Sequence, residues 1–137
     1  MNQHMETGTI DTILRAFEQG DIATLVNHID DNIDFRIDHY QDATDVNWQK
    51  AANKTELLAL LQRLGTEVFP KGTKMIEVSS THLGGHWVIT KLHQQFYYGV
   101  QAQMVDSETW IVSHSKAGKC DYFRETVTNV LPLAAAV

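Results

Sequence analysis

The stretch that decides the fold is FEQGDIATLVNHIDDNIDF, residues 17–35. Gly20 can end a helix in the left-handed conformation, and Asp21 can cap the start of the next helix. The pair Asp30-Asp31 ends that short helix. Residues 33–38 then alternate between apolar and polar side chains, which is the period of a strand with two different faces. This stretch therefore predicts a helix, a short helix and a strand in close succession.

Outward from this stretch, the pattern predicts helices in the first half of the chain and strands in the second. One apolar face spaced for a helix covers residues 10–19, and Asn53 with Glu56 resembles a capping box for a helix that runs to Val68. The expected strands cover residues 74–82, 86–97, 100–115 and 119–129, with a further short strand ending near residue 48. This order predicts a single α+β domain over residues 1–137.

Composition excludes several classes of partner. The formal net charge is −6, and the 11 Lys and Arg residues are scattered, so binding to nucleic acid is not expected. No stretch reaches the roughly 20 apolar residues of a membrane span, and residues 1–9 lack the apolar segment of a signal peptide. The single cysteine, Cys120, fits a reducing compartment, so we expect a cytoplasmic protein.

The histidines do not predict a metal site. His82 and His86 flank the Gly84-Gly85 turn and can approach each other, but no third ligand is evident near them. Phosphate-binding glycine loops, Ser-His-Asp patterns and Cys-x-x-Cys motifs are absent from the sequence. We therefore expect neither a metal nor a cofactor.

The order of elements resembles the nuclear transport factor 2-like superfamily, including its SnoaL-like polyketide cyclases and ketosteroid isomerases. Residues 17–35 and residues 116–127 carry the resemblance; in the second segment Ala117-Gly118-Lys119 precedes the last strand. The resemblance implies a cone-like roll, in which a curved, mainly antiparallel sheet wraps around the N-terminal and middle helices and leaves a pocket at the open end. It also implies a homodimer formed through the outer face of the sheet.

The resemblance also locates the three groups that steroid isomerases need. The tyrosine position corresponds to Ile13, the base to Arg36 (or Ile37), and the oxyanion-stabilising acid to Trp110. None of these residues can do that work. Steroid-isomerase chemistry is therefore excluded.

The same register predicts a largely apolar pocket for a small apolar organic ligand. Its expected lining residues are Ile13, Phe17, Asp34, Trp110, Val112, His114, Phe123 and Val127. Whether the chain is an enzyme stays open at this point.

If the chain is an enzyme, we expect cofactor-free acid–base chemistry, namely isomerisation, dehydration, cyclisation or hydrolysis. Glu125 would be the base and Arg36 its electrostatic partner, because the first and last strands are neighbours in this fold. Arg36 and Asp38 also repeat an Arg-x-Asp spacing of limonene epoxide hydrolases, where it lies on a different strand. The competing interpretation is that Arg36 and Asp38 simply lie on the solvent-exposed face of a strand.

The alternative is a non-catalytic ligand-binding or protein-assembly module of the same fold. An apolar C-terminal tail, residues 130–137, favours it slightly. A pocket filled by aromatic side chains would favour it strongly.

Overall fold

The computed structural model describes residues 3–40 and 48–133, with side chains from residue 8 onward. The expected conformation of residues 41–47 and of the tail from 134 lies outside the described residues. The elements in chain order are α1 (Gln3–Gln19), α2 (Ile22–Asn27), β1 (Ile29–His39), β2 (Lys50–Ala51), α3 (Lys54–Arg63), a π-helical turn (Leu64–Val68), β3 (Thr73–Gly84), β4 (Trp87–Tyr98), β5 (Gln103–Lys116) and β6 (Lys119–Pro132).

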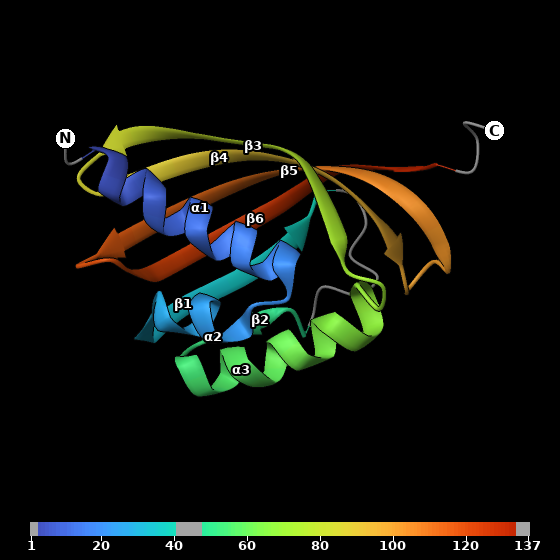
Figure 1. The fold of residues 1–137 in the computed structure, drawn as a ribbon, viewed down its shortest axis with the longest axis horizontal. Helices are drawn as coiled ribbons and strands as arrows, with labels where there is room; N and C mark the ends of the chain where they lie inside the picture. Colours follow the sequence, from blue (N-terminus) through green and yellow to red (C-terminus); the bar gives the residue numbers. More distant parts are fainter. Residues whose placement is uncertain (1–2, 41–47, 134–137) are drawn as a thin grey trace.

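The strands form one six-stranded sheet in the order β2-β1-β6-β5-β4-β3. Neighbouring strands are antiparallel except β1 and β6, which run parallel. The first long strand therefore lies beside the last one, as predicted. The sheet curves, and α1 and α3 lie on its concave side (Figure 1). This is the expected α+β roll.

Capping by polar side chains begins α2 and α3, as the sequence predicts. The Asp21 carboxylate accepts a hydrogen bond from the backbone amide of Thr24 at 3.2 Å. The Asn53 side chain accepts one from the amide of Glu56 at 2.9 Å. In turn, the Glu56 carboxylate accepts one from the amide of Ala52 at 2.8 Å. These bonds satisfy backbone donors that have no partner within a helix.

Several element boundaries differ from the prediction. Helix α1 begins at residue 3 rather than 10. Strand β1 begins at Ile29, so Asp30-Asp31 lies in the strand, where a register shift between Ile29 and Asp34 accommodates the extra residues. Strand β5 begins at Gln103, because a turn follows Gly99, and it continues through Asp106 without a break. The short strand before α3 is residues 50–51.

Two contacts fix α1 against β3. The Glu18 carboxylate accepts a hydrogen bond from the amide of Met75 at 2.6 Å. The Ser80 hydroxyl donates to the Asp11 carboxylate at 2.7 Å. Because the two bonds lie at different points along α1, they set both the position and the direction of the helix over the sheet.

The π-helical turn is held against the turn between β4 and β5. The amide of Gly99 donates to the carbonyl of Val68 at 3.1 Å. A Cβ atom at position 99 would lie 2.1 Å from the carbonyl oxygen of Glu67. Only glycine permits this approach, which brings Phe69 over the concave face of the sheet.

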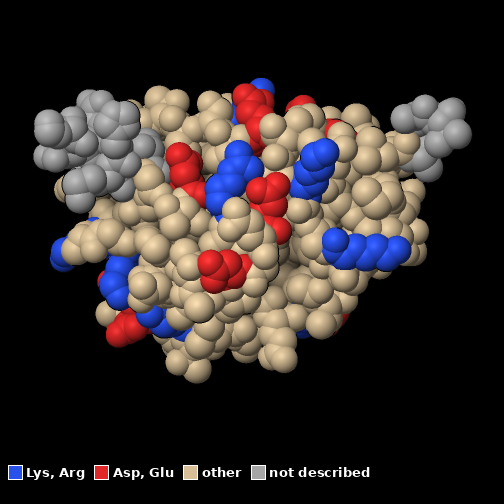
Figure 2. Space-filling model, viewed as in Figure 1, with Lys and Arg blue, Asp and Glu red and all other residues tan. Residues whose placement is uncertain are grey.

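The described helices include none that is both long enough and apolar enough to cross a membrane. On the face drawn in Figure 2, Lys and Arg side chains lie beside Asp and Glu side chains, and other residues cover most of the surface. Charges of both signs are thus mixed on this face.

Candidate functional site

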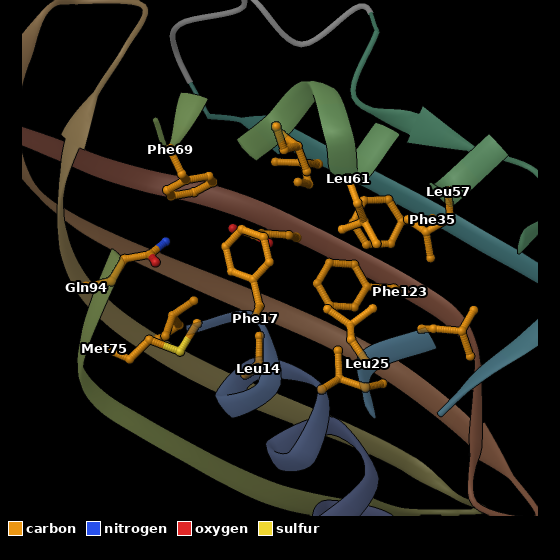
Figure 3. Close-up of a pocket in the computed structure, with 16 residues that line it drawn as sticks. Leu14, Phe17, Leu25, Phe35, Leu57, Leu61, Phe69, Met75, Gln94 and Phe123 are labelled. Carbon is orange, nitrogen blue, oxygen red and sulfur yellow. The ribbon is translucent and has the colours of Figure 1, made fainter. Parts of the chain in front are cut away.

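A cavity of about 70 Å³ lies between the concave face of the sheet and the helices (Figure 3). Its walls come from residues far apart in the chain. They are Ile13, Leu14, Phe17, Leu25, Ile29, Phe35, Ile37, Leu57, Leu61, Leu64, Phe69, Met75, Leu92, Gln94, Phe123 and Glu125. Helical spacing places the residues of α1 and α3 on faces that look toward the sheet.

Aromatic contacts shape the cavity. Phe35 of β1 stacks on Phe123 of β6, with ring centroids 4.5 Å apart and an angle of 11° between the planes. Phe17 meets Phe69 edge to face at 5.2 Å. Such pairs add roughly 0.5–1.5 kcal/mol each beyond the apolar area they bury. The walls are therefore well defined rather than loosely packed.

Glu125 is the ionisable residue among those that line this cavity. It lies beside Ile37 in the parallel pairing of β6 and β1, so its side chain shares the concave face with that isoleucine. Within the described chain, its carboxyl group makes no hydrogen bond or ion pair. Burial raises the pKa of Glu125 to about 7. Near neutral pH this group can therefore both accept and give up a proton.

Gln94 of β4 is the second polar residue of the cavity wall, and only 4% of it is exposed. The hydroxyl of Thr73 donates a hydrogen bond to its side-chain oxygen Oε1 at 2.7 Å. In this arrangement the oxygen end of the amide lies at Thr73. Figure 3 shows the amide group of Gln94 turned to the side on which Phe17 and Phe69 lie.

Shared lining residues place two further spaces beside this cavity. A second space of about 30 Å³ shares Ile37, Phe69, Gln94 and Glu125 with the cavity. The second space also shares walls with an open groove of about 220 Å³. Those shared residues are His39, Tyr98, Val127 and Val130. Glu125 thus stands between an apolar interior and a more polar mouth.

Part of the predicted pocket lies where it was expected. Ile13 and Phe17 of α1 and Phe123 and Glu125 of β6 all line the cavity. Val127 lines the second space. Helical spacing in α1 and the alternation of β6 place these side chains toward the interior.

The predicted pocket position of Asp34 and the predicted inward pairing of Arg36 with Glu125 are wrong. Asp38, whose spacing from Arg36 left catalysis and a solvent-exposed face both open, does not line the cavity either. These residues lie on the outer face of β1, where Arg36 pairs with Asp38 at 2.9 Å and Asp34 pairs with Arg124 at 3.0 Å. The register pairs Arg36 with Arg124, one residue away from Glu125. The predicted Arg36–Glu125 pair is therefore absent. The alternate residues, which are Ile33, Phe35 and Ile37, are apolar and are buried instead.

The predicted inward placement of Trp110, Val112 and His114 is also wrong. These side chains of β5 alternate with buried Thr109, Ile111 and Ser113, so they project from the outer face of the sheet. Trp110 is 45% exposed. The His114 ring lies 2.6 Å from the Asp121 carboxylate on that face. Small inward residues make this strand look more apolar on its outer side.

Sequence reasoning missed Gln94, Phe69 and the leucines of α3 as site residues. The leucine stripe did predict a buried helix face, which is now seen to close the cavity. Gln94 lies within the apolar alternation of Leu92, Phe96 and Tyr98, and a polar residue on a buried face is a signal of function.

Cys120 lies away from the cavity walls and is buried. Burial raises the pKa of its thiol to about 12. It is not suited to act as a nucleophile at neutral pH. Across residues 8–40 and 48–133, no three His, Cys, Asp or Glu side chains gather closely enough to hold a metal ion.

Comparison with known proteins finds similarity of structure alone. No family model and no curated protein sequence matches the chain. Bal32a from a soil-derived mobile gene cassette superposes with a TM-score of 0.74 at 19% identity, over 93% of this chain and 92% of that one. A proposed polyketide cyclase from Xanthomonas campestris superposes with a TM-score of 0.73 at 13% identity, over 92% of each chain.

An LEH-like epoxide hydrolase from M. tuberculosis gives a TM-score of 0.67 at 16% identity, over 93% of this chain and 85% of that one. An NTF2-like protein from Burkholderia xenovorans superposes with a TM-score of 0.70 at 16% identity, over 99% of this chain and 96% of that one. Identities this low establish architecture rather than chemistry. The chain therefore has the fold of the nuclear transport factor 2-like superfamily, the resemblance first indicated by residues 17–35.

Proposed function

We propose that the chain binds a small, mainly apolar organic molecule in the cavity and that Glu125 transfers a proton to or from it. The observation that carries this proposal is the Glu125 carboxyl group, which faces an apolar cavity and has no partner among the described residues. A buried carboxyl group without a partner costs stability, and such costs cluster at functional sites.

The reaction class that fits best is cofactor-free acid–base catalysis. A carboxyl group with a pKa of about 7 is close to the value that makes a general acid or base effective at neutral pH. Isomerisation, dehydration, cyclisation and hydrolysis all need such a transfer. Solved structures of the same fold, described as a proposed polyketide cyclase and an LEH-like epoxide hydrolase, are consistent with this class.

The test is a reaction that any positioned carboxylate in an apolar cavity accelerates. In the ring opening of 5-nitrobenzisoxazole, a base removes the proton on the ring carbon. That electron pair forms the nitrile, and the N–O bond breaks to release a coloured phenolate. We expect turnover by the wild-type protein that rises with pH as Glu125 ionises, with an apparent pKa of about 7.

Glu125→Gln should abolish this turnover. Glu108→Gln is the matched control, because Glu108 is an exposed residue on the outer side of β5. A wild-type rate no faster than that of Glu125→Gln would contradict the proposal. Equal losses in both variants would contradict it as well.

The second candidate is a non-catalytic binding module. The filling of the cavity by Phe17, Phe35, Phe69 and Phe123, which leaves about 70 Å³, favours it. In that case Glu125→Gln would keep or strengthen ligand binding, since it removes a charge from an apolar site, and no turnover would be seen with any variant.

A further inference from the structure

We propose that Gln94, oriented by Thr73, is the hydrogen-bond donor that selects a neutral carbonyl compound for the cavity beside Glu125. This inference rests on the proposed binding function and narrows it to a substrate class. The geometry of one buried amide, that of Gln94, carries this inference.

The position of Gln94 makes it a site residue rather than a surface residue. It projects from the concave face of β4 between the buried side chains of Leu92 and Phe96. It lines both the cavity and the adjoining second space, as Glu125 does. These two polar side chains therefore border the same cavity.

The oxygen end of the Gln94 amide lies against Thr73. The Thr73 hydroxyl donates to Oε1 of Gln94 at 2.7 Å, so the oxygen end of the amide is occupied. The amide nitrogen Nε2 carries two N–H groups, for which the described part of the chain supplies no acceptor. Because Gln94 lines the cavity, a molecule bound there can reach these donors. An acceptor atom of a bound molecule would complete the hydrogen bonding of this amide.

The rest of the wall defines the class of molecule. The other lining residues are apolar, so the body of the ligand is apolar. No lysine or arginine lines the cavity, and Glu125 is ionisable, so an anionic ligand is disfavoured. A ketone or other neutral carbonyl compound has an acceptor-only oxygen that matches the N–H groups of Gln94. It also has acidic carbon-bound protons that a carboxylate can remove.

The experiment compares two molecules of nearly the same shape, acetophenone and ethylbenzene, which differ in a carbonyl group against a methylene. Binding is measured by calorimetry or ligand-observed NMR at about pH 5.5, where most Glu125 is neutral because its pKa is about 7. We expect the wild-type protein to prefer acetophenone by roughly tenfold, the value of one hydrogen bond of ordinary strength.

Gln94→Met is close to Gln in shape and lacks the donor, so it should remove the preference while ethylbenzene still binds. Thr73→Val should reduce the preference, because the amide is then free to turn. Gln95→Leu is the matched control on the outer face of the same strand, where Gln95 donates to Asp106, and it should leave the preference unchanged.

The outcomes separate this inference from the proposed function. Equal binding of the two molecules to the wild-type protein would overturn the role of Gln94 and leave Glu125 as an acid–base group. A preference that persists in Gln94→Met would overturn it too. Binding of neither molecule would overturn both, because the cavity would then not accept a ligand. Binding of ethylbenzene to Gln94→Met also shows that this variant is folded.

Discussion

At the scale of single residues, Glu125 should make the stability of the protein depend on pH. The folded-state pKa is about 7, against 4.5 for a free side chain, so the folded state holds its proton more tightly than the unfolded state. Between these values the folded state binds more protons, and the free energy of unfolding therefore falls as pH rises. Below pH 4.5 the ionisation of Glu125 does not change the free energy of unfolding. Above about pH 7 it lowers the free energy of unfolding by its full amount.

We expect Glu125→Gln to gain about 3 kcal/mol in stability relative to wild type on going from about pH 4 to about pH 8, since each pKa unit is worth about 1.4 kcal/mol. Urea unfolding at the two pH values measures this difference. The exposed Glu108→Gln serves as the control and should show no comparable change. A stability gap that is the same at both pH values would show that Glu125 ionises normally.

The thiol of Cys120 should react very slowly in the folded protein. Its thiol is buried and has a pKa raised to about 12, and it donates a hydrogen bond to the carbonyl of Tyr122 at 3.3 Å. We expect an aromatic disulfide reagent to label it at least about a hundredfold more slowly in the folded protein than in urea, since the thiolate is the reactive form. Rapid labelling under native conditions would mean that β6 opens locally.

Residue patterns predicted some side-chain directions and misled others, for physical reasons. In β1 the apolar residues Ile33, Phe35 and Ile37 alternate with charges, and burial of the apolar set decides the direction. The family-based register placed the charged set inward and gave the wrong face. In β5 the pattern itself is ambiguous, because Trp110 is exposed while Thr109 is buried. No rule of alternation alone resolves that strand.

At the scale of elements, the contact between the π-helical turn and the β4–β5 turn should tolerate no side chain. Gly99→Ala would place a Cβ atom against the carbonyl of Glu67, and both partners are backbone, so neither can turn aside. We expect a loss of at least about 1–3 kcal/mol in the free energy of unfolding. We also expect weaker ligand binding, since Phe69 would be displaced from the cavity wall.

Gly65→Ala is the control for that substitution. Gly65 lies in the same π-helical turn, and a Cβ atom there meets nothing within 4 Å. Its replacement should be neutral or slightly stabilising, because alanine is a better helix former. Thermal unfolding of the two variants makes the comparison, and equal effects would show that the close approach at Gly99 is not what matters.

Element types were predictable, because Gly20, Asp21 and Asn53 mark helix boundaries by local chemistry. The boundaries of the elements, such as the start of β1, were less predictable from the sequence. Asp30-Asp31 reads locally as an interruption, yet pairing with β6 extends the strand back to Ile29. Tertiary pairing overrides a local signal here, and only the partner strand supplies that information.

At the scale of the whole molecule, the homodimer implied by the fold stays a prediction. The outer face of the sheet carries exposed Trp110 and Met104, each 45% accessible. Exposed aromatic and methionine side chains are typical of interfaces. We expect sedimentation to show a dimer that Trp110→Lys converts to a monomer. Leu58→Lys, which changes an exposed leucine on α3, should leave the dimer intact, and a monomeric wild type would refute this prediction.

The pairing of β1 with β6 has a consequence for synthesis on the ribosome. Ile37 of β1 pairs with Glu125 of β6, so the cavity cannot close until β6 has emerged. Until then β1 has an unpaired edge, and Phe35 lacks the ring of Phe123 on which it stacks. A nascent chain that stalls before β6 would therefore expose an unpaired strand edge that can pair with other chains. We expect such a chain to bind chaperones, and we expect the folded protein not to bind them.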